Sequence, residues 1–240
     1  MTKLSVNLNK IALLRNQRDI GIPSVIEAAR TVIKAGAYGI TVHPRPDERH
    51  IRYSDIYELA DMLTVEFNIE GNPFTGKFMD IVKEVKPAQA TLVPDSPDAS
   101  TSDHGWDLQK DGDRLVPIIK ELNDNGIRVS LFMDAETAPM QTAKKIGADR
   151  VELYTEPYAT AFRTQQKFDQ TLEQYVEAGK AATDAGLGLN AGHDLNLKNL
   201  AKFCNAVPGV LEVSIGHALI AEALDMGLKK TVTEYIKILS

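Results

Sequence analysis

Two histidines and two arginines lie close together in residues 40–51, directly after a short apolar segment. Residues 38–42 have the composition of a buried strand, and the chain turns polar at His43. Arg45 and His50 follow, and two prolines stiffen the turn between them. Guanidinium groups bind anions and imidazoles transfer protons near neutral pH. This stretch therefore predicts an anion site beside proton-transfer groups.

Polar residues end other apolar segments in the same way. Four of the five histidines lie at or just after a predicted strand, among them His193 and His217, and Glu70 closes another strand. Each has a structural interpretation when taken singly: His43 could bind backbone groups, and Glu70 or Glu152 could simply pair with an arginine. Their convergence on predicted strand ends favours a functional site.

Two glycine turns have the form of phosphate sites. Residues 190–193 (Asn-Ala-Gly-His) and 214–217 (Ser-Ile-Gly-His) each follow a predicted strand and precede a helix. Backbone N–H groups at such turns bind phosphate, although the glycines could also serve only to make tight turns. Arg18, Arg45 and His50 would form a second anion site.

Other kinds of chemistry have little support. The sequence has no His-x-x-x-His or Cys-x-x-Cys pair, and its histidines lie on separate predicted strands among arginines, so we predict no metal site. Its one cysteine, Cys204, lies in a predicted helix as a buried thiol. Lys10 follows the first strand and could form a Schiff base. Acid–base catalysis by histidine and glutamate on a phosphorylated substrate remains the leading hypothesis.

The candidate site residues can form one site only in a fold that brings the ends of several strands together. Apolar segments typical of strands alternate with segments of helical periodicity along the whole chain. The predicted strands are 4–9, 38–42, 65–69, 89–93, 128–133, 150–154, 187–191 and 210–215. The predicted helices are 23–35, 54–63, 77–85, 114–125, 137–146, 168–185 and 197–204, with further helical segments to residue 240.

About eight such units predict a (β/α)₈ TIM barrel with extra helices, an α/β fold whose active site lies at the carboxyl ends of the strands. Residues 1–240 contain no linker, so we expect a single catalytic domain. An open doubly wound sheet is the alternative, but no Gly-x-Gly-x-x-Gly follows the first strand. Residues 95–113 form a polar segment too long for an ordinary connection, and are predicted to be an active-site loop.

The composition limits the classes of partner that the protein can bind. The net charge of −6 argues against a nucleic-acid or membrane-surface binder, and no apolar run is long enough to span a membrane. The first residues also lack a signal-peptide core, which favours a cytoplasmic protein.

Seven segments of the chain resemble pyridoxine 5′-phosphate synthases in order and spacing. They include residues 43–50, with the sequence His-Pro-Arg-Pro-Asp-Glu-Arg-His, and the two glycine turns described above. The segments are 6–16, 39–51, 68–70, 92–94, 129–134, 190–193 and 215–217. The resemblance extends over essentially the whole chain.

The resemblance implies condensation of 3-amino-2-oxopropyl phosphate with 1-deoxy-D-xylulose 5-phosphate. The products would be pyridoxine 5′-phosphate, phosphate and water, formed in a homo-octamer with no metal or organic cofactor. His43, Glu70 and His193 match the acid–base residues of the family. The matching substrate-binding residues are Asn7, Arg18, Arg45, His50, Thr101, Gly216 and His217.

The chain departs from the family pattern at three places. Asn9 and Lys10 stand where an Asp-His pair is usual, so no catalytic role is transferred to them and they are predicted only to line the pocket, as is Glu152. Asp194 stands where a glycine is usual, which puts a carboxylate beside the predicted phosphate site. The loop around Trp106 also differs.

Two other functions stay open. One is a different barrel enzyme that acts on a phosphosugar, such as an epimerase or a thiazole-synthase-like enzyme. The other is a non-catalytic barrel that binds phosphorylated metabolites, in which the departures mark lost chemistry.

Overall fold

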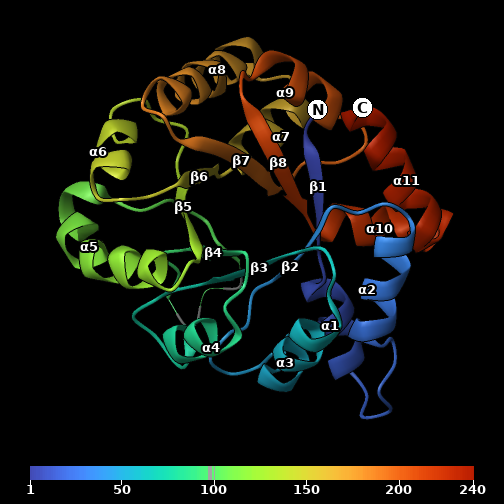
Figure 1. The fold of residues 1–240 in the computed structure, drawn as a ribbon. Coiled ribbons are helices and arrows are strands. Elements are labelled where there is room, and N and C mark those ends of the chain that lie inside the picture. Colours follow the sequence, from blue (N-terminus) through green and yellow to red (C-terminus); the bar gives the residue numbers. More distant parts are fainter. Residues whose placement is uncertain (97–98, 100) are drawn as a thin grey trace.

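The computed structural model describes residues 1–96, 99 and 101–240. Eight parallel strands close into a barrel in sequence order, because β1 pairs with both β2 and β8. Figure 1 shows the strands at the centre with the helices around them. The strands are β1 (Lys3–Asn7), β2 (Gly39–Val42), β3 (Glu66–Gly71), β4 (Gln89–Leu92), β5 (Arg128–Met133), β6 (Arg150–Leu153), β7 (Gly188–His193) and β8 (Val210–Ile215). The predicted (β/α)₈ fold is confirmed.

Eleven helices occur in the described part of the chain. They are α1 (Asn9–Asn16), α2 (Val25–Lys34), α3 (Tyr53–Met62), α4 (Phe78–Val85), α5 (Leu108–Asp124), α6 (Met140–Lys145), α7 (Glu156–Thr164), α8 (Phe168–Asp184), α9 (Leu200–Ala206), α10 (His217–Met226) and α11 (Leu228–Leu239). None of them is both long and apolar enough to cross a membrane.

Local chemistry explains most helix boundaries. The Ser24 side chain accepts a hydrogen bond from the Glu27 N–H and so caps α2, which places Pro23 before the helix rather than in its first turn as predicted. Gly36, with a φ of 103°, ends the turn after α2. In α9 the predicted start was three residues early, because the Asn196 side chain accepts from the N–H of Asn199 in a turn that precedes the helix.

Two predictions of helices and loops were wrong. The predicted loop 95–113 is shorter, because α5 begins at Leu108, where the Asp107 carboxylate accepts from the N–H groups of Gln109 and Lys110. Three of its residues, 97, 98 and 100, lie outside the described part of the chain. Helix α7 was not predicted, although Pro157 at its start is a common signal for a first helical turn.

The barrel has a polar interior and an apolar outer layer. Hydrogen bonds cross the interior from Ser5 to Thr41, and through Thr41, Asn68 and Thr91 on three neighbouring strands. The alternate residues, such as Val6 and Ile40, belong to the hydrophobic core between the strands and the helices. Because side chains alternate along a strand, polar residues project toward the axis and form successive layers below the barrel mouth.

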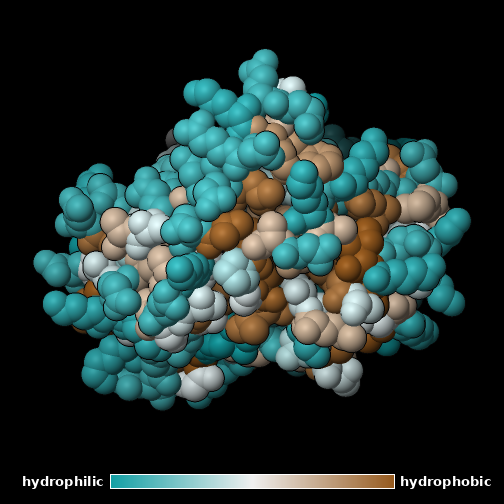
Figure 2. Space-filling view, turned by 90° about the horizontal axis from the view of Figure 1, so that it is seen from above, coloured by the Kyte–Doolittle hydropathy of each residue, from teal (hydrophilic) through white to brown (hydrophobic). Residues whose placement is uncertain are grey.

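The outer surface is mixed in character. In Figure 2 hydrophilic side chains cover the periphery, and hydrophobic residues gather in a band across the middle of the face shown. Exposed apolar side chains occur on α1 and in the segment after it, where Leu14, Ile20 and Ile22 are 53, 54 and 64% exposed.

Candidate active site

A cavity of about 370 Å³ lies at the barrel mouth, where polar residues of several loops meet the carboxyl ends of the strands. Its lining residues are Asn7, Asn9, Lys10, His43, Arg45, His50, Thr101, Ser102, His193, Asp194, Ser214, Gly216 and His217. Most of the predicted site residues are therefore brought together. Glu70 and Glu152 are buried in the strands and contact this set.

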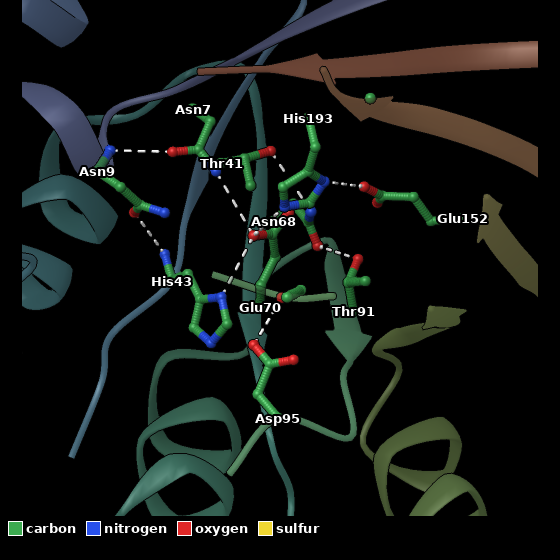
Figure 3. Close-up of polar contacts among 12 residues, drawn as sticks. Asn7, Asn9, Thr41, His43, Asn68, Glu70, Thr91, Asp95, Glu152 and His193 are labelled. Carbon is green, nitrogen blue, oxygen red and sulfur yellow. Dashed lines mark hydrogen bonds and ion pairs between the residues drawn. The ribbon is translucent and has the colours of Figure 1, made fainter. Parts of the chain in front are cut away.

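Glu70 lies between two histidines. Its Oε2 atom is 3.7 Å from Nδ1 of His43 and 4.0 Å from Nε2 of His193, and it accepts a hydrogen bond from Asn7 at 3.5 Å. The other carboxylate oxygen, Oε1, has no hydrogen-bond partner among the described residues. Figure 3 shows these side chains converging from β1, β2, β3 and β7. One carboxyl oxygen thus lies within ion-pair distance of two imidazoles.

Glu152 contacts the opposite side of the His193 ring. Nδ1 of His193 lies 3.3 Å from Oε1 of Glu152, which is fully buried on β6 (Figure 3). The φ of His193 is 51°, a left-handed conformation that side chains other than glycine adopt infrequently. This conformation at the end of β7 is a strain of the kind that functional residues carry.

Burial and charge give the three groups different protonation states. Burial raises the pKa of Glu70 to about 8, so this carboxyl is largely protonated at neutral pH. Burial, reinforced by Arg45, lowers the pKa of His43 well below 6.5 and keeps that imidazole neutral. Burial alone would lower the pKa of His193, but the Glu152 carboxylate beside Nδ1 outweighs it and raises the value to about 9. The site therefore combines a neutral base with two acids.

Asn9 holds the His43 backbone. Its N–H donates to Oδ1 of Asn7 at 2.9 Å, and its own Oδ1 accepts from the N–H of His43 at the same distance. These two amide contacts link the start of α1 to the ends of β1 and β2 (Figure 3). The Asn9 amide therefore positions the His43 backbone, and this contact does not require an ionisable side chain.

Arg45 is fixed by a buried carboxylate. The guanidinium lies 2.7 Å from Oδ2 of Asp95, which also accepts a hydrogen bond from Ser102 at 2.6 Å. Asn72 donates to the Asp95 carbonyl at 2.9 Å. Arg45 and Asp95 are only 4 and 2% exposed. Asp95 therefore joins the arginine to the loop that carries Thr101 and Ser102 into the cavity.

The far end of the same loop is anchored by Trp106. Its indole N–H donates to the Leu92 carbonyl and its backbone N–H to the Phe132 carbonyl, both at 2.9 Å. Phe74 packs edge-on against the indole, with 6.1 Å between ring centroids, and the Arg114 guanidinium lies 4.0 Å from the Phe74 ring centroid. These contacts hold the tryptophan against the ends of β4 and β5.

His50 is a hydrogen-bond donor and not a proton carrier. Its Nδ1 accepts from the N–H of Ile51 at 2.9 Å, while Arg15 and Asn16 hold its carbonyl. Burial lowers the pKa of His50 to about 4, and the nearby charges of Arg45 and Lys10 contribute. A neutral ring whose Nδ1 is an acceptor carries its proton on Nε2, so it can donate to a ligand in the cavity.

The turn at β8 and α10 supplies backbone donors. Gly216 precedes α10, and among the described residues no side chain caps the first N–H groups of that helix. A Cβ at Gly216 would lie 3.1 Å from the Asn7 Cβ, so the turn after β8 packs tightly against the end of β1. The Ser214 hydroxyl lines the same cavity and has no hydrogen-bond partner in the described part of the chain. These groups offer donors of the kind that bind anions, and the anion site stays a prediction.

One triad has metal-ligand geometry. Ligand atoms of Glu70, Glu152 and His193 all lie within 4.8 Å of one another. The Glu152 carboxylate holds a proton on His193 and burial holds one on Glu70, and a metal would have to displace both protons. The arrangement favours an acid–base site over a metal centre at neutral pH, and the absence of a metal stays a prediction.

The outcome for the other predicted residues is mixed. Arg18 is exposed beyond α1 and does not line the cavity. Asp95, Ser102 and Ser214 were missed as site residues. Asp95 had a usable signal, since a carboxylate directly after the Pro94 that closes a predicted strand lies at the barrel mouth by the same rule that identified Glu70.

Comparison with known proteins agrees with this geometry. The family model described as pyridoxal phosphate biosynthesis protein PdxJ matches residues 4–240. The chain is 56% identical to pyridoxine 5′-phosphate synthase of Albidiferax ferrireducens, over 98% of this chain and 96% of the relative. It is 54% identical to the enzyme of that name from Christiangramia forsetii, over the whole of both chains.

Among solved structures, phosphoribosyl anthranilate isomerase of Thermotoga maritima matches with a TM-score of 0.65 and 16% identity, covering 99% of this chain and 98% of that one. At that identity the match shows the shared barrel fold alone. The family model and the curated relatives go further, because they match nearly every residue of the chain. The chain belongs to the PdxJ family of pyridoxal phosphate biosynthesis proteins.

Proposed function

We propose that the chain is a pyridoxine 5′-phosphate synthase that condenses 3-amino-2-oxopropyl phosphate with 1-deoxy-D-xylulose 5-phosphate. The observation that carries the proposal is the position of Glu70 between His43 and His193. Pyridine-ring formation requires imine formation, loss of phosphate and dehydrations, and each of these steps moves protons. A site with one neutral base and two protonated acids suits such a sequence.

The proposed roles follow from the protonation states. Neutral His43 removes a proton from a substrate carbon or nitrogen. Protonated Glu70 returns a proton to a leaving hydroxyl group, and its contact with both imidazoles allows it to be reloaded. The His193 imidazolium, held by Glu152, protonates a second leaving group. These assignments are testable separately, because each of the three residues can be replaced on its own.

Two anion sites fit the two phosphorylated substrates. Arg45, His50 and Thr101 line one part of the cavity, and the uncapped turn at Gly216 and His217 forms another. Asn7 lies between them as a further substrate contact. Arg18, which the resemblance implies as a ligand, is exposed outside this cavity, and its role stays a prediction.

A coupled assay tests the function. Purified protein receives both substrates in the presence of EDTA, and pyridoxine 5′-phosphate absorbance and phosphate release are followed together. Equal amounts of the two products are expected, with no effect of the chelator. If phosphorylated ligands bind but no ring product forms, the chain is instead a binding protein or a different phosphosugar enzyme.

The homo-octamer and the cytoplasmic location also belong to the proposal. The exposed apolar side chains of residues 14–22 supply surface that subunit contact would cover. Light scattering of the purified protein would measure the number of subunits, and a monomeric mass would contradict the octamer.

A further inference from the structure

Helix α1 contacts the loop between β2 and α3 at both ends of the helix. Its first residue, Asn9, accepts through its side chain from the N–H of His43, where that loop begins. Its last residue, Asn16, donates through Nδ2 to the carbonyl groups of residues 48, 49 and 50, at 3.3, 3.1 and 2.8 Å. The loop carries three of the residues that line the active-site cavity. The contacts with α1 therefore determine how these residues are presented to a ligand.

Arg15 uses all three nitrogens of its guanidinium group in the same network. Nη1 forms an ion pair with Asp55, Nη2 donates to the His50 carbonyl at 3.0 Å, and Nε donates to Oδ1 of Asn16 at 3.0 Å. The last contact orients the Asn16 amide, because an amide whose oxygen faces Arg15 turns its NH₂ group toward the loop carbonyls. A lysine has a single nitrogen on a flexible chain and cannot make these three contacts together.

Asp55 extends the network to the start of α3, which lies beside α1 in Figure 1. Its Oδ2 accepts from the N–H of Arg52 at 2.7 Å, while its Oδ1 pairs with Arg15. Arg15 and Asp55 are only 7 and 5% exposed. A buried ion pair adds little net stability, because desolvation of the two charges offsets their attraction. The pair is therefore better explained by the loop geometry that it fixes.

The direction of the loop carbonyls matters for anion binding. A carbonyl oxygen is partly negative and repels a phosphate, whereas an imidazole N–H attracts one. Arg15 and Asn16 do not line the cavity, so the carbonyls that they hold are turned toward α1 and not toward a ligand. The Nδ1 atom of His50 accepts from the N–H of Ile51, which leaves its Nε2 side for the ligand. Glu48, with a φ of 53°, has a left-handed conformation that the network holds in place.

Resting on the proposed synthase function, we infer that Arg15 and Asn16 are positioning residues that orient His50 for binding the phosphate of the pentulose phosphate. They turn the carbonyls of residues 48–50 away from the phosphate and so present the imidazole N–H to it, beside the Arg45 guanidinium. Neither residue touches the substrate. Their effect on binding passes through the loop backbone.

The rival interpretation is a structural clamp that joins α1 to α3 whatever the ligand. Loss of such a clamp would lower stability and would weaken both substrates alike. Arg128 is a matched control, because it forms an ion pair with Glu66 and donates to the Gln89 side chain at 2.9 Å. These three residues begin β5, β3 and β4, so this ion pair lies at the end of the barrel opposite to the cavity.

Binding of one substrate by itself separates these interpretations. The dissociation constant of 1-deoxy-D-xylulose 5-phosphate is measured by calorimetry for the wild type, Arg15→Lys, Asn16→Ala and Arg128→Lys. We expect binding about tenfold weaker in Arg15→Lys and Asn16→Ala, and within about twofold of the wild type in Arg128→Lys. Asn16→Ala keeps the buried ion pair, so it tests the carbonyl contacts even where Arg15→Lys fails to fold.

Steady-state kinetics and NMR add two further readouts. In Arg15→Lys and Asn16→Ala the KM for the pentulose phosphate should rise about tenfold, while kcat and the KM for 3-amino-2-oxopropyl phosphate stay within about threefold. Burial lowers the pKa of His50 to about 4, and a ring released from the loop should titrate closer to 6.5. The ring signals, assigned with His50→Gln, should show this rise in Arg15→Lys and not in Arg128→Lys.

Three outcomes would overturn the inference. The first is unchanged binding of the pentulose phosphate in both Arg15→Lys and Asn16→Ala. The second is an equal weakening of the two substrates, and the third is an equal effect of Arg128→Lys. Failure of the synthase function shows separately, as absence of ring product in the wild type whatever the binding data show.

Discussion

Nδ1 of His193 lies 3.3 Å from Oε1 of Glu152, a carboxylate that is fully buried in the wall of the barrel. The contact keeps a proton on the imidazole, because burial by itself would favour the neutral ring. Neither oxygen of Glu152 forms a hydrogen bond elsewhere in the described chain, so His193 is its nearest charged partner. The His193 imidazolium can act as an acid at neutral pH only while the Glu152 carboxylate stays ionised.

Replacing Glu152 by glutamine should remove that acid. In Glu152→Gln the pKa of His193 falls from about 9, the imidazole is neutral at pH 8, and kcat drops roughly 100-fold. The measurement is the pH profile of kcat, whose alkaline limb should move to lower pH. Glu212→Gln is the control, since Glu212 is a buried barrel carboxylate that pairs with Arg150 instead. An unmoved alkaline limb in Glu152→Gln would contradict the role given to the pair.

The raised pKa of Glu70 makes a prediction about stability. Its value in the folded protein is about 8 and its ordinary value is 4.5, so the folded state binds the proton more tightly. The stability that this proton contributes is complete below pH 4.5 and is lost as pH rises through 8. Glu70→Gln cannot ionise, so its melting temperature should exceed that of the wild type most clearly at pH 8–9.

The same variant should lose activity. Glutamine keeps the shape of Glu70 but transfers no proton, and kcat should fall by about 10²–10⁴. Thermal melts from pH 5 to 9, together with single-turnover assays, check both outcomes. Glu58→Gln, at an exposed helix position, provides the comparison. Equal melting curves for Glu70→Gln and the wild type at alkaline pH would show that the buried carboxyl is not held protonated.

Asp95 should act through Arg45. In Asp95→Asn the guanidinium loses its charged partner at 2.7 Å and the loop loses a strong acceptor for Ser102. We expect the KM for the pentulose phosphate to rise about tenfold, with a smaller change in kcat, because a mobile arginine binds phosphate less well. Ser102→Ala removes only the loop contact and should show a smaller effect. If Asp95→Asn lowers kcat at unchanged KM, Asp95 serves the chemical step rather than binding.

Two glycine substitutions should change stability in opposite directions. A Cβ at Gly192 would lie 2.1 Å from the Ser214 carbonyl oxygen, so Gly192→Ala must push β7 and β8 apart and should cost about 2–4 kcal/mol. A Cβ at Gly112 in α5 meets nothing within 4 Å, and Gly112→Ala should stabilise the protein by about 0.5–1 kcal/mol. Denaturant unfolding of both variants measures the difference, and similar midpoints would contradict the close approach at the barrel mouth.

The fold was predictable because its periodicity is repeated and local. Strands β5 and β8 have the predicted bounds, since in each of them apolar residues alternate with polar ones one or two residues after a glycine. Helix α7 was missed because its start at Glu156 was taken for the loop after β6, and because polar residues such as Thr160 and Arg163 interrupt its apolar face. The start of α5 was missed for a related reason: residues 109–114 are almost entirely polar, and only the Asp107 cap marks the boundary.

The sequence was enough to select the residues of the site but not their protonation states. Position at strand ends was enough to select His43, Glu70 and His193. Their opposite pKa shifts depend on burial and on distances across three strands, which no local pattern contains. Arg18 shows that residue type alone does not predict position. An arginine suits an anion site, but Arg18 lies beyond α1 and outside the cavity.

The packing of Trp106 gives the protein an internal optical probe. It is the only tryptophan in the sequence, it is 6% exposed, and it lies at the base of the loop that brings Ser102 to Asp95. Its emission therefore arises from one known environment, beside Phe74 and in contact with the ends of β4 and β5. Any rearrangement of that loop on ligand binding changes the solvent contact of a single indole, so stopped-flow fluorescence of the unlabelled enzyme can follow substrate entry in real time.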